Sequence, residues 1–145
     1  MYSVFQPSFP EQLDKIFALR YAILRAPWKQ IRGSERDNAE ETSVHAMIED
    51  EHGNCIATGR LQFNSPDEGQ IRFMAVSELH RGKKLGQLIL KFLEEKAKEN
   101  HCRKIVLQAR ENAVRFYQSN GYLVEEKSFL LFDAIQHYRM SKKLL

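Results

Sequence analysis

The chain has 145 residues, of which 43% are hydrophobic and 28% are charged, a composition typical of one globular domain and not of a disordered or fibrous chain. Its formal net charge of +3, from 22 Lys and Arg against 19 Asp and Glu, is too small to indicate binding to nucleic acid by itself. The apolar stretches are far shorter than the ~20 residues that cross a membrane, so we expect no membrane partner.

The first predicted element is a helix that begins at a capping box formed by Ser8 and Glu11 and stops by Pro27. After it, residues 29–43 are polar and lack any periodicity, which predicts a long loop. Loops of this length in a small domain are often functional. We therefore expect residues 29–43 to shape a binding site.

The rest of the chain alternates between strand patterns and helix patterns, with turn residues between them. The expected elements are strands 44–50, 55–63 and 70–76, a helix 85–100, a strand 104–109, a short helix 111–121 closed by Gly121, and strands 122–126, 129–133 and 137–143. This order predicts an α+β fold, with one mixed central sheet flanked by helices. No internal linker or repeat interrupts it, so residues 1–145 are expected to form a single domain.

The cysteines and the N-terminal sequence bear on the compartment. Two cysteines, Cys55 and Cys102, are too few for a disulfide framework, so we expect reduced thiols. The start of the chain, MYSVFQPSFP, lacks the basic residues and apolar run of a secretory signal. Together these features favour a cytoplasmic protein. The histidines and cysteines also lack metal-ligand spacing, so we expect no metal site.

Cations and glycines gather at the start of the predicted helix 85–100, in the sequence RGKKLG from Arg81 to Gly86. The first N–H groups of a helix have no intrahelical partners, and its dipole places partial positive charge at that end. Glycine lets the backbone come close to a ligand without a Cβ in the way. The pattern is neither a P-loop nor a Rossmann motif. It predicts an anion cradle suited to a diphosphate, or simply a solvated basic turn.

Two segments in a fixed order carry a resemblance to a known family. MAVSELHRGKKLGQLIL, followed by ARENAVRFYQSNGY, resembles the GNAT superfamily of acetyl-CoA-dependent N-acetyltransferases, and the ending AIQHYRM is similar to that of small bacterial ElaA-like members. The family's turn reads Q/R-x-x-G-x-G/A. This sequence departs from it at Lys84, where the pattern has its first glycine, and from the ElaA-like ending at Gln136, which replaces a proline.

The resemblance implies a GNAT fold with a V-shaped cleft between two splayed parallel strands, FMAV and KIVLQA. It implies that acetyl-CoA is the cosubstrate, with its pantetheine arm beside the first strand and its pyrophosphate in the turn. The coenzyme-binding residues it implies are Met74, Ala75, Val76, Arg81, Gly82, Lys83, Lys84, Leu85, Gly86, Gln87, Asn112 and Phe116. Asn112 could instead cap the short helix.

Acetyl transfer to an amine needs a group that takes a proton from the amine and a group that stabilises the departing thiolate. Tyr117 matches the family's acid position; its alternative role is to pack the short helix. His137 is the leading candidate for the base. His45 and Glu111 are weaker candidates, and water could relay the proton instead.

The leading functional hypothesis is an N-acetyltransferase that moves an acetyl group from acetyl-CoA to a primary amine, either on a small molecule or on a protein lysine or N-terminus. The alternative from another class is a non-catalytic acyl-CoA-binding sensor or interaction module. The acidic residues Glu35, Asp37, Glu40 and Glu41 of the loop would suit a cationic acceptor, or they form a solvated surface. The strands FLLFD and HYRMSKK would allow pairing across a homodimer.

Overall fold

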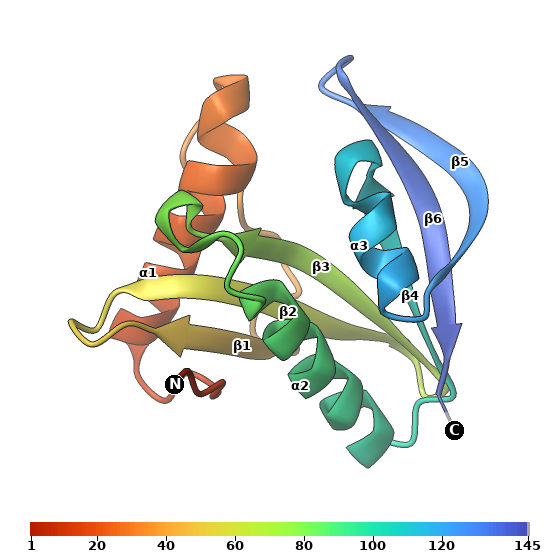
Figure 1. Ribbon diagram of the computed structural model, residues 1–145, viewed down its shortest axis with the longest axis horizontal. Coiled ribbons are helices and arrows are strands. Elements are labelled where there is room, and N and C mark those ends of the chain that lie inside the picture. Colours follow the sequence, from red (N-terminus) through yellow and green to blue (C-terminus); the bar gives the residue numbers. More distant parts are fainter. Residues whose placement is uncertain (145) are drawn as a thin grey trace.

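One mixed sheet runs through the fold, in the strand order β1-β2-β3-β4-β6-β5 (Figure 1). The computed structural model describes residues 1–144. Its strands are β1 Val44–Glu49, β2 Cys55–Ser65, β3 Glu68–Val76, β4 Lys104–Arg110, β5 Leu123–Leu131 and β6 Ile135–Lys143, and its α-helices are α1 Pro10–Arg20, α2 Leu85–Glu99 and α3 Val114–Ser119. β3 pairs with β4 in parallel, and the other neighbouring strands are antiparallel. The predicted α+β class with one mixed sheet is confirmed.

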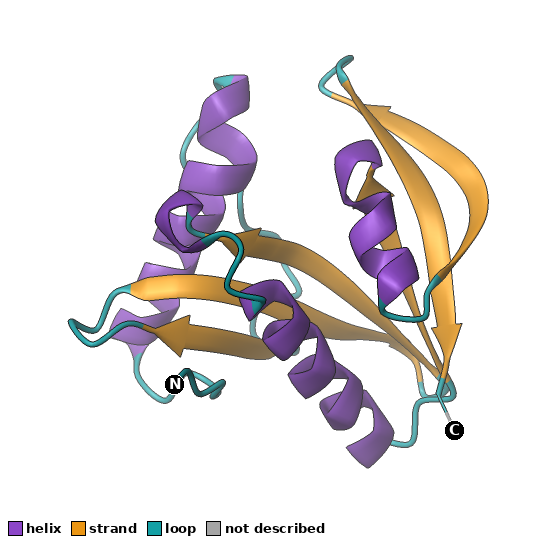
Figure 2. Ribbon diagram, viewed as in Figure 1, coloured by secondary structure: helices purple, strands orange, loops and turns teal. Residues whose placement is uncertain are grey.

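Helices cover both faces of the sheet (Figure 2). Ala46 and Ile48 of β1 belong to the core that includes α2, whereas Met47 between them packs against Ile16 and Phe17 of α1. Because successive strand residues point to opposite faces, α1 and α2 lie on opposite sides of the sheet. α3 packs into the same core as α2. Among residues 1–144, no helix is both long enough and apolar enough to span a bilayer.

The N-terminal helix differs from prediction at its start. It begins at Pro10, and the side-chain oxygen of Gln12 accepts hydrogen bonds from the amides of Ser8 (2.5 Å) and Phe9 (3.3 Å). The expected capping box of Ser8 and Glu11 is therefore wrong, because the N-cap is Phe9, one position after Ser8, which places Gln12 instead of Glu11 at the third helical position. Past α1 the chain continues through a π-helical turn, Tyr21–Arg25, and a 3-10 turn, Ala26–Trp28.

The C-terminal strands also differ from prediction. Segments 122–126 and 129–133 were expected as two strands, but they form a single strand, β5, which keeps its pairing with β6 by shifting register at two places. β6 lies between β4 and β5. Both of its edges are therefore paired within the chain, and HYRMSKK has no free edge for a homodimer. β5 is an outer strand of the sheet, so only FLLFD keeps that option.

β3 and β4 splay apart after four paired residues. Glu68–Ile71 pairs with Lys104–Leu107, and in the described chain the pairing ends there. Phe73 has a φ of 57°. The register between β2 and β3 shifts beside it, between the pair Thr58–Ala75 and the pair Arg60–Arg72. Such a bulge bends and twists a strand. It turns β3 away from β4, and the two strands splay apart in the V shape that the resemblance implied (Figure 1).

A buried polar contact joins the two halves of the molecule near the narrow end of the V. The hydroxyl of Tyr122 donates to the carboxylate of Glu94 on α2 at 2.8 Å, and Lys142 of β6 contacts the same carboxylate at 3.2 Å. Tyr122 is almost completely buried. A carboxylate held by a phenol and an ammonium has its hydrogen-bonding groups satisfied, so this contact fixes α2 against the C-terminal strands.

Candidate functional site

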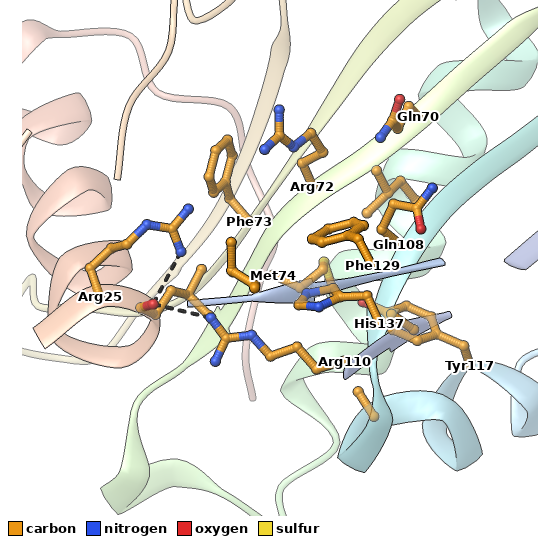
Figure 3. Close-up of a pocket in the computed structure, with 15 residues that line it drawn as sticks. Arg25, Gln70, Arg72, Phe73, Met74, Gln108, Arg110, Tyr117, Phe129 and His137 are labelled. Carbon is orange, nitrogen blue, oxygen red and sulfur yellow. Dashed lines mark hydrogen bonds between the residues drawn. The ribbon is translucent and has the colours of Figure 1, made fainter. Parts of the chain in front are cut away.

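A cavity of about 410 Å³ lies where β3 and β4 separate (Figure 3). Its walls come from several different elements, which the bulge in β3 and the π-helical turn bring to one place. The lining residues that bear on chemistry are Leu24 and Arg25 of the π-helical turn, Arg72, Phe73 and Met74 of β3, Gln108 and Arg110 of β4, Tyr117 of α3, Phe129 of β5 and His137 of β6. The cavity therefore brings the two predicted catalytic residues together with Met74.

Tyr117 both packs the core and lines this cavity. Its ring contacts Phe116 and Tyr122 edge to face, with centroids 5.0 and 5.7 Å away, and 7% of the residue is exposed. Burial raises the pKa of the phenol. The hydroxyl therefore stays protonated at neutral pH and can donate a hydrogen bond to a group in the cavity. The packing and catalytic interpretations of Tyr117 are compatible with each other.

His137 is held in one tautomer by its neighbours. Its Nδ1 lies 3.0 Å from the carbonyl oxygen of Ile135, and a carbonyl only accepts, so Nδ1 carries the hydrogen and Nε2 keeps the lone pair. The ring stacks on Phe129 at 4.4 Å. Burial, together with the positive charges of Arg110 and Arg25, lowers the pKa of His137 below its ordinary value. The neutral form, which a base requires, is thereby favoured.

The two weaker base candidates lie away from this arrangement. His45 accepts from Arg20 at Nδ1 (3.2 Å) and donates from Nε2 to the carbonyl oxygen of Glu40 (2.8 Å). Its lone pair is therefore used in a buried network, and it does not line the cavity. Glu111 is exposed, and neither it nor Asn112 caps the short helix, whose N-cap position is Ala113 without a side-chain bond. The capping alternative for Asn112 is therefore wrong.

The turn before α2 contains two residues with positive φ. Gly82 has a φ of 83° and Lys84 a φ of 62°, so Lys84 adopts the left-handed conformation at the position where the family pattern has a glycine. Lys84 is the N-cap of α2 and gives no side-chain cap. The amides of Leu85, Gly86 and Gln87 in the first turn thus remain free of intrahelical acceptors.

The side chains of the turn have separate tasks. Arg81 and Lys84 are exposed, and Lys83 contacts the hydroxyl of Tyr2 at 3.2 Å.

Gly86 lets α2 approach α3, because a Cβ there would stand 3.3 Å from the ring of Phe116. Leu85 is buried in the core, and Gln87 donates to Asn120 at 3.2 Å. The predicted coenzyme residues Gly86 and Phe116 are thus neighbours in space.

The main chain of β3 presents free groups to the cleft. The amide of Ser77 donates to Ile56 of β2 at 2.8 Å. Main-chain groups of a strand point alternately to its two sides, so those of Val76 and Met74 face away from β2 and toward the open side. Ala75 pairs with Thr58 of β2 and is directed the other way.

The acidic residues of the long loop neutralise buried arginines. Asp37 contacts Arg60 at 2.6 Å, and Glu40 contacts Arg20 and Arg60, each at 2.9 Å. The side chains of Arg20 and Arg60 are fully buried. Neither a surface for a cationic acceptor nor a merely solvated surface describes Asp37 and Glu40, because both carboxylates are committed to these ion pairs.

The other two acidic residues complete the picture of the loop. Glu35 is buried and accepts from the amide of Gly33 at 2.8 Å, and Glu41 alone is exposed. None of residues 29–43 lines the cavity. The loop contacts the cavity wall indirectly: Asp37 lies 3.1 Å from Arg72, which lines the cavity.

Sequence reasoning missed the three arginines of the cavity, Arg25, Arg72 and Arg110. They come from the π-helical turn, β3 and the end of β4, and no local motif joins positions so far apart. The only signal in the sequence is that Arg110 directly follows a buried strand, as chemistry-bearing residues often do. No group of three metal-ligating side chains occurs within residues 1–144.

Comparisons with known proteins point to one family. The model of the acetyltransferase (GNAT) family matches residues 1–122. An uncharacterised N-acetyltransferase of Bacillus subtilis, YjcF, is 28% identical over 132 residues, which are 91% of this chain and 93% of the relative.

Solved structures share the whole fold at low identity. A presumed N-acetyltransferase from Lactobacillus plantarum is 21% identical, with a TM-score of 0.87 over 99% of both chains. Escherichia coli ElaA is 20% identical, with a TM-score of 0.77 over 98% of both. A GNAT family acetyltransferase from Elizabethkingia anophelis, solved with acetyl-CoA bound, is 13% identical, with a TM-score of 0.76 over 99% of this chain and 98% of that one. At these identities the structures establish the shared fold.

Proposed function

The chain belongs to the GNAT family of acetyltransferases, and from that premise we propose that it moves an acetyl group from acetyl-CoA directly to a primary amine. The observation that carries the proposal is the cavity between the splayed strands β3 and β4. Its wall contains both Tyr117 and His137, and the lowered pKa of His137 favours the neutral form of the ring. A sensor that only binds an acyl-CoA would need neither group at the point where the two strands part.

The proposed coenzyme site fits the chemistry of acetyl-CoA at two points. The first-turn amides of α2, free of intrahelical acceptors and preceded by Gly82 and Lys84 at positive φ, suit a pyrophosphate. The main-chain groups of Met74 and Val76 on the open side of β3 suit a pantetheine arm, which carries amides of its own. The predicted roles of Arg81, Lys83, Asn112 and Phe116 around this site remain part of the proposal.

His137 is proposed as the base. A free alkylamine has a pKa near ~10.4 and is mostly protonated at neutral pH, so it must lose a proton before it attacks. Nε2 of His137 holds a lone pair because Nδ1 donates to Ile135. The lowered pKa of the ring keeps that lone pair available at neutral pH, so Nε2 can accept the proton directly or through one water.

Tyr117 is proposed to stabilise the departing sulfur. As the new C–N bond forms and the C–S bond breaks, negative charge develops on sulfur, and a protonated phenol can donate a hydrogen bond to it. Burial disfavours a phenolate at this position. Tyr117 therefore contributes mainly as a hydrogen-bond donor, and the proton lost by the amine balances the one that the thiol finally carries.

The proposal extends to the location, the oligomeric state and the partners of the enzyme. The thiols of Cys55 and Cys102 are free, in keeping with a cytoplasmic location. The outer strand β5 is the remaining candidate edge for a homodimer. Nucleic acid is not proposed as a partner, since the cations of the turn surround a site suited to a diphosphate.

One experiment tests the proposed function. The protein is titrated with acetyl-CoA in a calorimeter, and a panel of amines is screened for release of the coenzyme thiol. We expect saturable binding of acetyl-CoA and thiol release that depends on the amine. Binding without thiol release for every amine would favour the sensor, and a failure to bind acetyl-CoA would overturn both.

A further inference from the structure

Three arginines converge on the wall of the cavity that holds His137. Arg25 lies in the π-helical turn, Arg72 on β3 and Arg110 at the end of β4, and all three line the cavity (Figure 3). Their guanidinium groups lie on the side of the split where α1 and its π-helical extension approach the sheet. The proposed pyrophosphate site is elsewhere, at the start of α2, so these arginines are not needed to bind the coenzyme's diphosphate.

The positive charge of this group is only partly neutralised within the chain. Arg72 contacts Asp37 at 3.1 Å. Arg25 and Arg110 form no ion pair with a carboxylate of the described residues; instead both donate to the carbonyl oxygen of Leu24, each at 3.1 Å. Arg25 also donates from Nε to the carbonyl oxygen of Ser34 at 3.1 Å. Carbonyls orient a guanidinium, but they cannot cancel its charge.

The fully buried arginines of the described chain have carboxylate partners, whereas Arg25 and Arg110 of the cavity do not. The fully buried Arg20 and Arg60 are matched with Asp37 and Glu40 at 2.6 to 2.9 Å. Arg25 and Arg110 are half-buried, and the shared carbonyl of Leu24 holds them side by side. Burial and the charge of Arg25 lower the pKa of Arg110, and burial and the charge of Arg72 lower the pKa of Arg25. Bringing such charges together is unfavourable unless an anion completes the site.

We propose that the amine acceptor carries an oxyanion group, a carboxylate or a phosphate, which Arg25 and Arg110 bind with Arg72 beside them. The planar guanidinium matches the oxygens of either group in a two-point contact. A cavity of about 410 Å³ is in the size range of small-molecule sites. The anion would direct the amino group toward His137 in the same cavity. This inference rests on the proposed acetyl transfer and narrows its acceptor to a small anionic amine.

The test compares acceptors that differ only in the anion. Glucosamine 6-phosphate is paired with glucosamine, and β-alanine with β-alaninamide, and kcat/KM is measured for each by thiol release at saturating acetyl-CoA. We expect the anionic member of at least one pair to be favoured by about ten-fold or more, as charged hydrogen bonds allow. A preference within the first pair alone points to phosphate, and one within the second alone to carboxylate.

Matched variants locate the preference. Arg110→Met and Arg25→Gln should each reduce the ratio of anionic to neutral kcat/KM toward one, and Arg110→Lys should keep part of it. Arg103→Met is the control, because the Arg103 side chain is 84% exposed and precedes the other end of β4. Melting temperatures show whether each variant is folded. If one arginine variant does not fold, the other carries the comparison.

A binding measurement separates this inference from the proposed function. The complex with coenzyme A is titrated by calorimetry with the same four compounds, which needs no turnover. Tighter binding of the anionic members, lost in Arg110→Met or Arg25→Gln, would support the oxyanion site even if no amine is acetylated, a result that would contradict only the proposed transfer. Equal turnover and equal binding within both pairs, or a preference for the neutral members, would overturn the inference.

Discussion

At the scale of single residues, Tyr117 makes a sharp prediction because its ring and its hydroxyl have different tasks. Phenylalanine keeps the edge-to-face contacts with Phe116 and Tyr122 and removes one oxygen. We expect Tyr117→Phe to lower kcat by about 100-fold or more, since the departing sulfur loses its donor, while the dissociation constant of acetyl-CoA stays the same. Thiol release and calorimetry measure the two quantities. A variant with the parent kcat would exclude the proposed role.

His137 predicts a dependence of the rate on pH. The pKa of its ring is lowered from the ordinary 6.5, chiefly by burial, and the base acts in its neutral form. The rate should therefore be flat around neutral pH and should decline only as the pH falls below about 6.5. In His137→Asn we expect a much lower rate without this decline. An unchanged acid limb in the variant would show that another group accepts the proton.

At the scale of elements, the turn before α2 depends on the left-handed conformation of Lys84. A non-glycine residue with positive φ stores on the order of 1 kcal/mol of strain. Lys84→Gly relieves it, so this variant should bind acetyl-CoA as well as the parent protein. Lys84→Val should bind several-fold more weakly, because a β-branched residue strongly disfavours φ near 62°.

Calorimetric titration of both Lys84 variants with acetyl-CoA checks this prediction. Lys84→Ala is the matched control for the loss of the charge, since it removes the ammonium without branching at Cβ. Equal affinity of the valine and glycine variants would mean that the shape of the turn does not matter for the coenzyme.

The bulge of β3 depends on the space left by Gly59 on β2. A Cβ at Gly59 would stand 2.5 Å from Sδ of Met74 and 2.7 Å from Cγ2 of Ile89 on α2. Gly59→Ala should therefore lower the free energy of unfolding by about 1–3 kcal/mol, as overpacking does. Urea denaturation measures this loss. Gly33→Ala is not a suitable control, because Gly33 has positive φ. Glu41→Gln changes an exposed residue and serves as the control; it should leave the free energy of unfolding unchanged.

At the scale of the whole molecule, the long loop is joined to the sheet by Asp37. Hydrogen bonding to Arg60 lowers the pKa of Asp37 from 3.8 to about 2. Because the folded pKa lies below the unfolded one, the stabilisation is complete above about pH 4 and is lost as the pH falls toward 2. This contribution is on the order of 2 kcal/mol.

Asp37→Asn should therefore lower the free energy of unfolding at pH 7 and flatten its decline between pH 4 and 2. Urea denaturation at several pH values measures both effects. If the variant loses stability equally at every pH, including pH 2, then the carboxylate's charge is not the cause.

The sequence predicted those features whose chemically important residues lie next to one another along the chain. The turn from Arg81 to Gly86 and the helix after it could be predicted, because cations, glycines and an apolar stripe are adjacent along the chain. Tyr117 and His137 were predicted through the resemblance, and both line one cavity; their roles stay predictions. Periodicity alone did not join 122–126 to 129–133, because register shifts interrupt the alternation of β5.

Other features depend on long-range packing and leave no local pattern. The positive φ of Phe73 could not be predicted, since no glycine or asparagine stands there. The pairing of Arg20 and Arg60 with the loop joins residues 20 or more positions apart, so the roles of Asp37 and Glu40 were misinterpreted. The three arginines of the cavity come together only because β3 bends and the π-helical turn lies across the opening.

The short pairing between β3 and β4 has a consequence for the time course of amide exchange. Within residues 1–144, β3 pairs with β4 through Glu68–Ile71 alone, so the amides of Met74 and Val76, which point away from β2, have no partner strand in the free protein and should exchange with deuterium quickly. Coenzyme bound along this edge would act as a missing strand and slow their exchange, whereas Ala75, directed at β2, should be protected in both states. Deuterium uptake resolved to single amides would thus record the occupancy of the split directly.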